Sequence, residues 1–118
     1  MLPRRGVIEI ELLRRYGRTP AGTRAVGWFE VSEFPDVYFN HQRELHIQVA
    51  DEPRVVGGTG WFAWVPAPGT PQEAAEAALL ERVLRDVVSL VEEQQTSAKH
   101  QRFRVVRAEW QDESRAGR

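Results

Sequence analysis

Residues 70–95 carry the pattern that most constrains how this chain folds. Thr70 followed by Pro71 and Glu73 is typical of a helix start, with threonine as the N-cap, proline in the first turn and glutamate closing a capping box. Apolar side chains then recur every three or four residues, at Ala77, Leu80, Leu84, Val87 and Val91. The sequence therefore predicts one long amphipathic helix over about 71–95.

The apolar side of this helix is both long and wide. At 1.5 Å per residue the helix would span roughly 37 Å, against roughly 25 Å for a strand of seven or eight residues. Further apolar residues widen its apolar sector to about half the circumference, beyond the ~100° that a surface helix needs. A strongly curled sheet could wrap this width. Alternatively a partner protein, most simply a second copy of the chain, covers it and contacts Leu79, Val83 and Leu90.

Several stretches outside the helix alternate in polarity or are rich in β-branched and aromatic residues, as strands are. They cover residues 7–13, 24–33, 44–49, 61–65 and 103–110, with a shorter candidate at 37–40. Gly57-Gly58-Thr59-Gly60 is interpreted as a flexible turn. The order of elements predicts an α+β fold, a mostly antiparallel sheet of four or five strands with the helix on one face and a C-terminal strand.

The length of the chain suits one domain with a sizeable core. Its 118 residues allow roughly two-thirds of the unfolded surface to be buried. We expect residues 1–118 to form a single domain, with about 111–118 as a flexible tail. The residues expected to be buried are Ile8, Ile10, Leu45, Ile47, Val49, Leu80, Leu84, Val87 and Val91.

Composition excludes several classes of protein. The chain has no cysteine, which excludes a disulfide scaffold and a thiolate metal site. No run approaches 18 apolar residues, and the N-terminus lacks a secretory pattern, so we expect a cytoplasmic protein without a membrane partner.

The charges are segregated along the chain. Residues 1–24 carry +4, residues 25–98 carry −8 and residues 99–118 carry +3. If the first and last strands are neighbours, their arginines form a basic stripe on the face away from the helix, and a tryptophan there offers a stacking surface for bases. A nucleic-acid interface on this surface would use Arg14, Arg15, Arg104, Arg107 and Trp28. Against it stand an isoelectric point near 6.3 and the absence of ribonucleoprotein motifs.

No constellation of residues indicates catalysis or cofactor binding. His41 and His46 are five positions apart, a spacing that suits neither one strand face nor one helix face, so we expect no metal site. The serines lack a nucleophile elbow, and the glycines at 57–60 lead into a strand rather than a phosphate-binding helix. We expect no catalytic residues and no cofactor.

The sequence favours a non-enzymatic assembly, adaptor or protein-interaction subunit that forms oligomers. The first alternative is a nucleic-acid-binding module built on the basic terminal strands. The second is a small-molecule-binding or catalytic cup between sheet and helix, lined by Trp61 and Trp64. A contact between the helices of two copies would indicate the assembly function. An exposed basic sheet would indicate nucleic-acid binding, and an enclosed pocket would indicate the cup.

Overall fold

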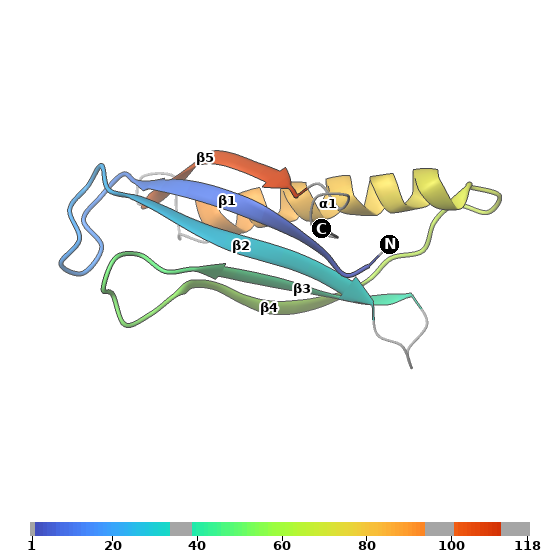
Figure 1. Cartoon of the computed structure of the whole chain (residues 1–118), viewed down its shortest axis with the longest axis horizontal. Coiled ribbons are helices and arrows are strands. Elements are labelled where there is room, and N and C mark those ends of the chain that lie inside the picture. The colour runs from blue at the N-terminus through green and yellow to red at the C-terminus, as the bar shows by residue number, and fades with distance from the viewer. Residues whose placement is uncertain (1, 34–38, 94–100, 112–118) are drawn as a thin grey trace.

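A computed structural model describes residues 2–33, 39–93 and 101–111. It contains five strands and one helix, and β5 follows the helix (Figure 1). Their bounds are β1 Arg4–Leu12, β2 Arg24–Glu33, β3 Asn40–Ile47, β4 Val56–Ala63, α1 Gln72–Glu93 and β5 Phe103–Trp110. The predicted α+β fold is confirmed.

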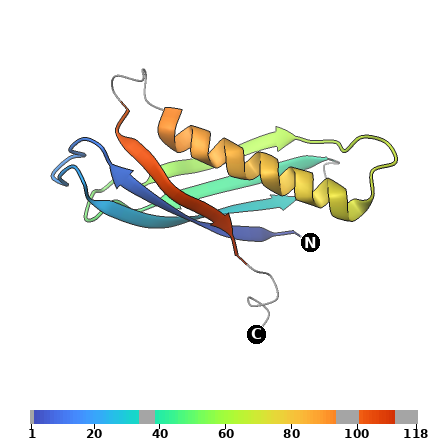
Figure 2. The ribbon, with the colours of Figure 1, turned by 90° about the horizontal axis from the view of Figure 1, so that it is seen from above.

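The strands form one fully antiparallel sheet with the order β4-β3-β2-β1-β5. β1 lies between β2 and β5, so the first and last strands are neighbours, as the basic-stripe hypothesis requires. After β4 the chain crosses the whole sheet through α1 and enters at the opposite edge as β5. Figure 2 shows α1 running diagonally over the strands on one face of the sheet.

The core lies between α1 and the sheet. Alternate residues of β1, Ile8, Ile10 and Leu12, are at most 1% exposed because period-two alternation turns them all toward the helix. Phe29 in β2 meets Trp110 of β5 edge to face, with ring centroids 4.8 Å apart. Seven of the expected core residues are buried: Ile8, Ile10, Leu45, Ile47, Val49, Val87 and Val91.

The face of α1 that meets the sheet differs from the predicted one. Its buried residues recur every four positions, and Leu80 and Leu84 are only partly buried beside them. A line of residues four apart turns by 40° at each step, because an α-helix advances 100° per residue. This line of buried residues, here called the seam, therefore slants across the helix, in keeping with the diagonal path of α1 over the sheet. It consists of Ala75, Leu79, Val83, Val87 and Val91.

The length mismatch expected between helix and strands is small. α1 has 22 residues, and the longest strand, β2, has 10. At the usual rises these correspond to roughly 33 Å and roughly 34 Å. The sheet is therefore long enough to accompany the helix.

The boundaries of the elements bring further corrections. The Thr70 hydroxyl donates to the backbone oxygen of Ala67 at 2.6 Å, so this side chain closes a turn, and the described contacts include no bond to the Glu73 amide. The first helical bond runs from the Ala75 amide to the Pro71 oxygen at 2.9 Å. Of the predicted short strand, residues 37 and 38 lie outside the described residues. So do helix residues 94 and 95 and tail residues 112–118.

Candidate functional site

The outer side of β5 is closed by the helix. The Val105 amide donates to Glu92 Oε2 at 2.9 Å, and the Trp110 indole donates to the Leu80 backbone oxygen at 3.0 Å. Both acceptors belong to α1, which packs against β5 more extensively than against any other strand. The helix therefore covers the outer side of β5 and occupies its outward amide at Val105.

The outer side of β4 is built differently, and we name it the β4 edge (Val56–Ala63). β4 is the last strand of the sheet, and the described part of the chain places no strand beyond it (Figure 1). The Trp64 amide bonds the Phe39 oxygen at 2.9 Å, continuing the ladder toward β3. Since peptide groups of an antiparallel strand point alternately to its two sides, those of Gly57 and Thr59 point away from β3.

No charged side chain interrupts the sequence from Val55 to Val65. Three large apolar residues in this stretch are exposed: Val55 by 41%, Trp61 by 67% and Val65 by 61%. Natural sheets protect an edge strand with charges, proline or a bulge, because an unprotected edge pairs with other strands. None of these devices occurs within the β4 edge.

The glycines of β4 belong to the strand, so the prediction of a flexible turn over Gly57–Gly60 is wrong. A β-carbon on Gly57 would lie 2.2 Å from the Leu45 backbone oxygen, and one on Gly60 would lie 2.4 Å from Arg43 Nη2. Gly57 also has a φ of 122°, a conformation that side chains disfavour. These glycines therefore allow the backbone of β3 and the Arg43 side chain to approach β4 closely.

A groove of about 430 Å³ lies between β4 and α1. Arg43 enters it from β3 and donates from Nη1 to the Gly58 backbone oxygen at 3.1 Å. Burial lowers the pKa of Arg43, and the nearby carboxylate of Asp86 opposes this shift. An arginine remains protonated under such conditions, so the groove holds one partly desolvated positive charge. Its lining includes Arg43, Gly60, Phe62, Asp86, Ser89 and Leu90.

Arg82 of α1 fixes one end of the groove. Its guanidinium lies 4.7 Å from the centre of the Phe62 ring and 3.7 Å from Asp86 Oδ2. Its Nη1 also donates to the Ala63 backbone oxygen at 3.4 Å, which occupies the outward carbonyl at this end of β4. The part of the edge around Gly57 and Thr59 has no such cover among the described residues.

His41 is buried next to the groove. It is 4% exposed, stacks on Phe62 with ring centroids 5.4 Å apart, and contacts Trp64 edge-on at 6.3 Å. Its Nδ1 has no hydrogen-bond partner in the described structure. His46 lies on the opposite face of β3, exposed and stacked on Trp28 at 5.6 Å. Among the described residues, no group of three or more histidine or acidic side chains is placed to hold a metal ion.

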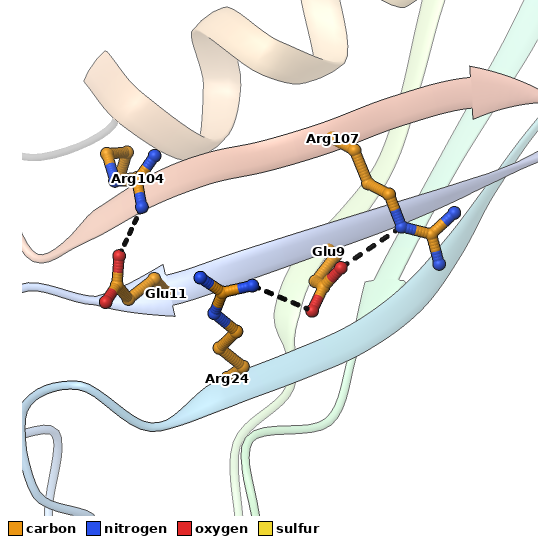
Figure 3. A network of polar contacts seen from close by, with 5 residues as sticks. All are labelled: Glu9, Glu11, Arg24, Arg104 and Arg107. Carbon is orange, nitrogen blue, oxygen red and sulfur yellow. Dashed lines mark hydrogen bonds and ion pairs between the residues drawn. The ribbon is translucent and has the colours of Figure 1, made fainter.

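The outer face of the sheet, away from α1, carries paired charges rather than a basic stripe (Figure 3). Arg104 bonds Glu11 across β5 and β1, and Arg107 bonds Glu9 at 3.1 Å. Arg24 of β2 lies 3.7 Å from the same Glu9. The hydrogen bond from Arg104 lowers the pKa of Glu11. Two of the four arginines expected to bind phosphates are thus held by carboxylates of the neighbouring strand.

The remaining residues of the predicted nucleic-acid interface lie apart from this network. Arg14 and Arg15 are exposed in the segment after β1. Trp28 is half-buried on β2, with the Arg5 guanidinium 4.1 Å above its ring and His46 stacked beside it. The faces of this indole are therefore already partly occupied by protein side chains.

The residues predicted to contact a partner are also divided. Leu79 is 3% exposed and Val83 is fully buried, both against the chain's own sheet. Neither side chain is therefore available to contact a partner protein. The apolar sector of α1 is wide because its line of buried residues slants around the helix. Leu90 is partly exposed and lines the groove beside β4.

Comparisons with protein-family models, curated proteins and solved structures find no match to this chain. In the described residues, no helix combines the length and apolar character needed to cross a membrane. The case for a function therefore depends on the β4 edge and the groove. Sequence reasoning missed the β4 edge, although the uncharged stretch 55–65 was a visible signal. The groove lies between sheet and helix, where the cup was expected, and its lining includes Trp61 but not Trp64.

Proposed function

We propose that this protein is a non-enzymatic protein-interaction module that accepts an extended strand at the β4 edge. One observation carries the proposal: of the two sheet edges, α1 closes β5, whereas no described element covers Gly57 and Thr59 of β4. Added strands gain affinity from main-chain hydrogen bonds and specificity from pockets for alternate side chains.

The groove supplies such a pocket. A strand beside β4 would direct every second side chain toward the α1 face, where Phe62 and Leu90 offer apolar surface and Asp86 offers a charge. This proposal retains the expected interaction function and moves its site from the helix margin to the sheet edge. The nucleic-acid alternative loses support, because Arg104 and Arg107 already pair with glutamates.

The proposal can be tested with a synthetic peptide of sequence 55–65, carrying added lysines at both ends for solubility. Titrated into the ¹⁵N-labelled full chain, it should shift the amide resonances of Gly57 and Thr59 and leave that of Val105 unchanged. A control peptide with proline in the position of Thr59 lacks the central N–H and should bind far more weakly.

Two results would contradict strand addition. One is the absence of any shift in β4 when light scattering shows the chain to be a monomer. The other is an equal response to the proline peptide, which would mean that side-chain contacts alone hold it.

A further inference from the structure

We propose that the strand accepted at the β4 edge is β4 of a second copy, paired antiparallel with Thr59 on the two-fold axis. This inference rests on the proposed strand addition and names its occupant. The joined strands would make one continuous sheet of ten strands from two copies of the five-stranded sheet. Thr59 of each copy then faces Thr59 of the other, with their outward peptide groups exchanging hydrogen bonds.

The outer face of β4 is complementary to itself in this register. Residues equally distant from Thr59 lie opposite each other, so Trp61 lies opposite Gly57 of the second copy. Trp61 is 67% exposed while its Nε1 donates to Gln42 Oε1 of β3 at 3.2 Å, and Gly57 has no side chain to fill the space across from it. An aromatic ring placed over a cross-strand glycine covers the exposed backbone of that glycine. The symmetry places this contact twice in the interface.

The helix-facing side of β4 fits the same register. Gly58 lies opposite Gly60 of the second copy, so no side chain obstructs the approach. Val56 lies opposite Phe62 of the second copy, which pairs two apolar residues. Because 55–65 contains no charge, the residues of the joined strands oppose no like charges. Each copy also brings Arg43 over Gly58 and Gly60 on this side, with Asp86 as the nearby opposite charge.

A strand from another protein could use the same hydrogen bonds, but the second copy explains more of the molecule. Edge pairing between identical chains gives a closed dimer only if each chain offers one edge, because two open edges would let the pairing continue into fibres. Here α1 packs against β5 and Glu92 occupies the outward amide of Val105, so β4 is the more open edge of each copy. The closed dimer is the natural end point of such an arrangement.

The dimer also completes the groove. An antiparallel pair of strands has its two-fold axis perpendicular to the sheet, so both α1 helices lie on the same face. The two grooves would then open toward each other and form one channel, floored by β3 and β4 of both copies. Arg43 and Asp86 from each copy would contribute to its lining.

The first test measures the mass of the full chain by light scattering over a dilution series. The wild-type protein should change from dimer to monomer on dilution. Thr59→Lys places two like charges opposite each other at the axis and should raise the dissociation constant by at least ~10-fold. Thr59→Val keeps the shape and β propensity of the side chain and should preserve the dimer. Circular dichroism checks that both variants are folded.

The second test identifies the register. Because the chain has no cysteine, a single introduced thiol can form a protein–protein disulfide only between copies. Thr59→Cys should crosslink efficiently in oxidised glutathione, since facing residues of paired strands have Cα atoms about 5.5 Å apart, within disulfide range. Gln48→Cys, on an exposed residue just after β3 and so one strand removed from the proposed axis, is the control and should crosslink slowly.

A monomer at all concentrations would overturn the dimer, as would equal crosslinking at positions 59 and 48. The proposed strand addition would survive that outcome if the 55–65 peptide still shifted Gly57 and Thr59. A dimer that Thr59→Lys leaves intact would overturn this interface and place self-association elsewhere.

Discussion

The two edges of this sheet show how one helix can cover one edge strand of an antiparallel sheet and leave much of the other edge strand exposed. At β5, α1 accepts hydrogen bonds from the Val105 amide and the Trp110 indole. At β4, a groove separates the helix from the sheet, and the main described bridge is Arg82 to Ala63. The edges differ in charge as well, because β5 and β1 share ion pairs whereas residues 55–65 carry none.

This difference separates the part of the molecule that stabilises the fold from the part that is available for binding. Burial beneath the helix stabilises the sheet from β5 across to β3 and reaches Val56 at the start of β4. Exposed apolar side chains and outward peptide groups mark β4 as the part available for binding. Substitutions at β5 should therefore lower the stability of the fold, whereas substitutions at β4 should weaken association.

The largest effect is expected under the helix seam. Leu79→Ala should lower the free energy of unfolding by ~2–5 kcal/mol, the usual cost for a buried leucine. Leu84→Ala, at the partly buried margin, should cost ~1–2 kcal/mol, since less apolar surface is lost. Urea denaturation of both variants measures the difference. Equal losses, or a larger one for Leu84→Ala, would show that the helix meets the sheet through the face first predicted from sequence.

The next effect compares one tryptophan at each edge. Trp110→Phe keeps a ring against Phe29 but removes the indole donor to Leu80, and should cost ~0.5–1.5 kcal/mol beyond the smaller buried area. Trp61→Phe changes an exposed residue and should alter the stability of the monomer by less than ~0.5 kcal/mol. Thermal and urea unfolding at a concentration where the chain is monomeric would decide this. Similar losses from both substitutions would contradict the division between the edges.

A smaller effect concerns the ion pairs beside β5. Arg104→Gln should raise the pKa of Glu11 toward its ordinary value of 4.5, because the hydrogen bond from Arg104 is the main cause of the lowered pKa. A lowered folded-state pKa contributes stability above the unfolded pKa, and this contribution is lost as pH falls through the folded pKa. The two proteins should therefore differ slightly near neutral pH and converge in acid. A carbon-detected titration of Glu11 provides the measurement, and an unchanged pKa would remove Arg104 as the cause.

The smallest expected effect is on nucleic-acid binding. Fluorescent single-stranded RNA and duplex DNA, titrated near 50 mM salt, should show no specific binding, because Arg104 and Arg107 are neutralised by Glu11 and Glu9. Binding that weakens steeply with salt and with substitution of Arg14 and Arg15 would revive that alternative. Each phosphate contact would then contribute a slope of roughly 0.7–0.9 log units.

The sequence by itself determined the elements, because their signals are local. The β-branched and aromatic residues of 24–33 identified a strand with the bounds that the structure shows, and the start pattern and apolar spacing placed α1 within two residues of its observed ends wherever those ends are described. The glycines of β4 were misassigned because their reason is not local: Gly57 and Gly60 allow close approach by Leu45 and Arg43, residues of another strand.

Only the tertiary structure decided how these elements meet. The apolar sector of the helix covers about half its circumference, so sequence alone left open which line of residues would form the seam. Packing against a twisted sheet selected Leu79 and Val83 and turned Leu84 to the margin. The same packing set α1 closer to β5 than to β4. A strand lies at the edge of a sheet when no other strand pairs with its outer side. Contacts between residues far apart in the chain decide which strand that is.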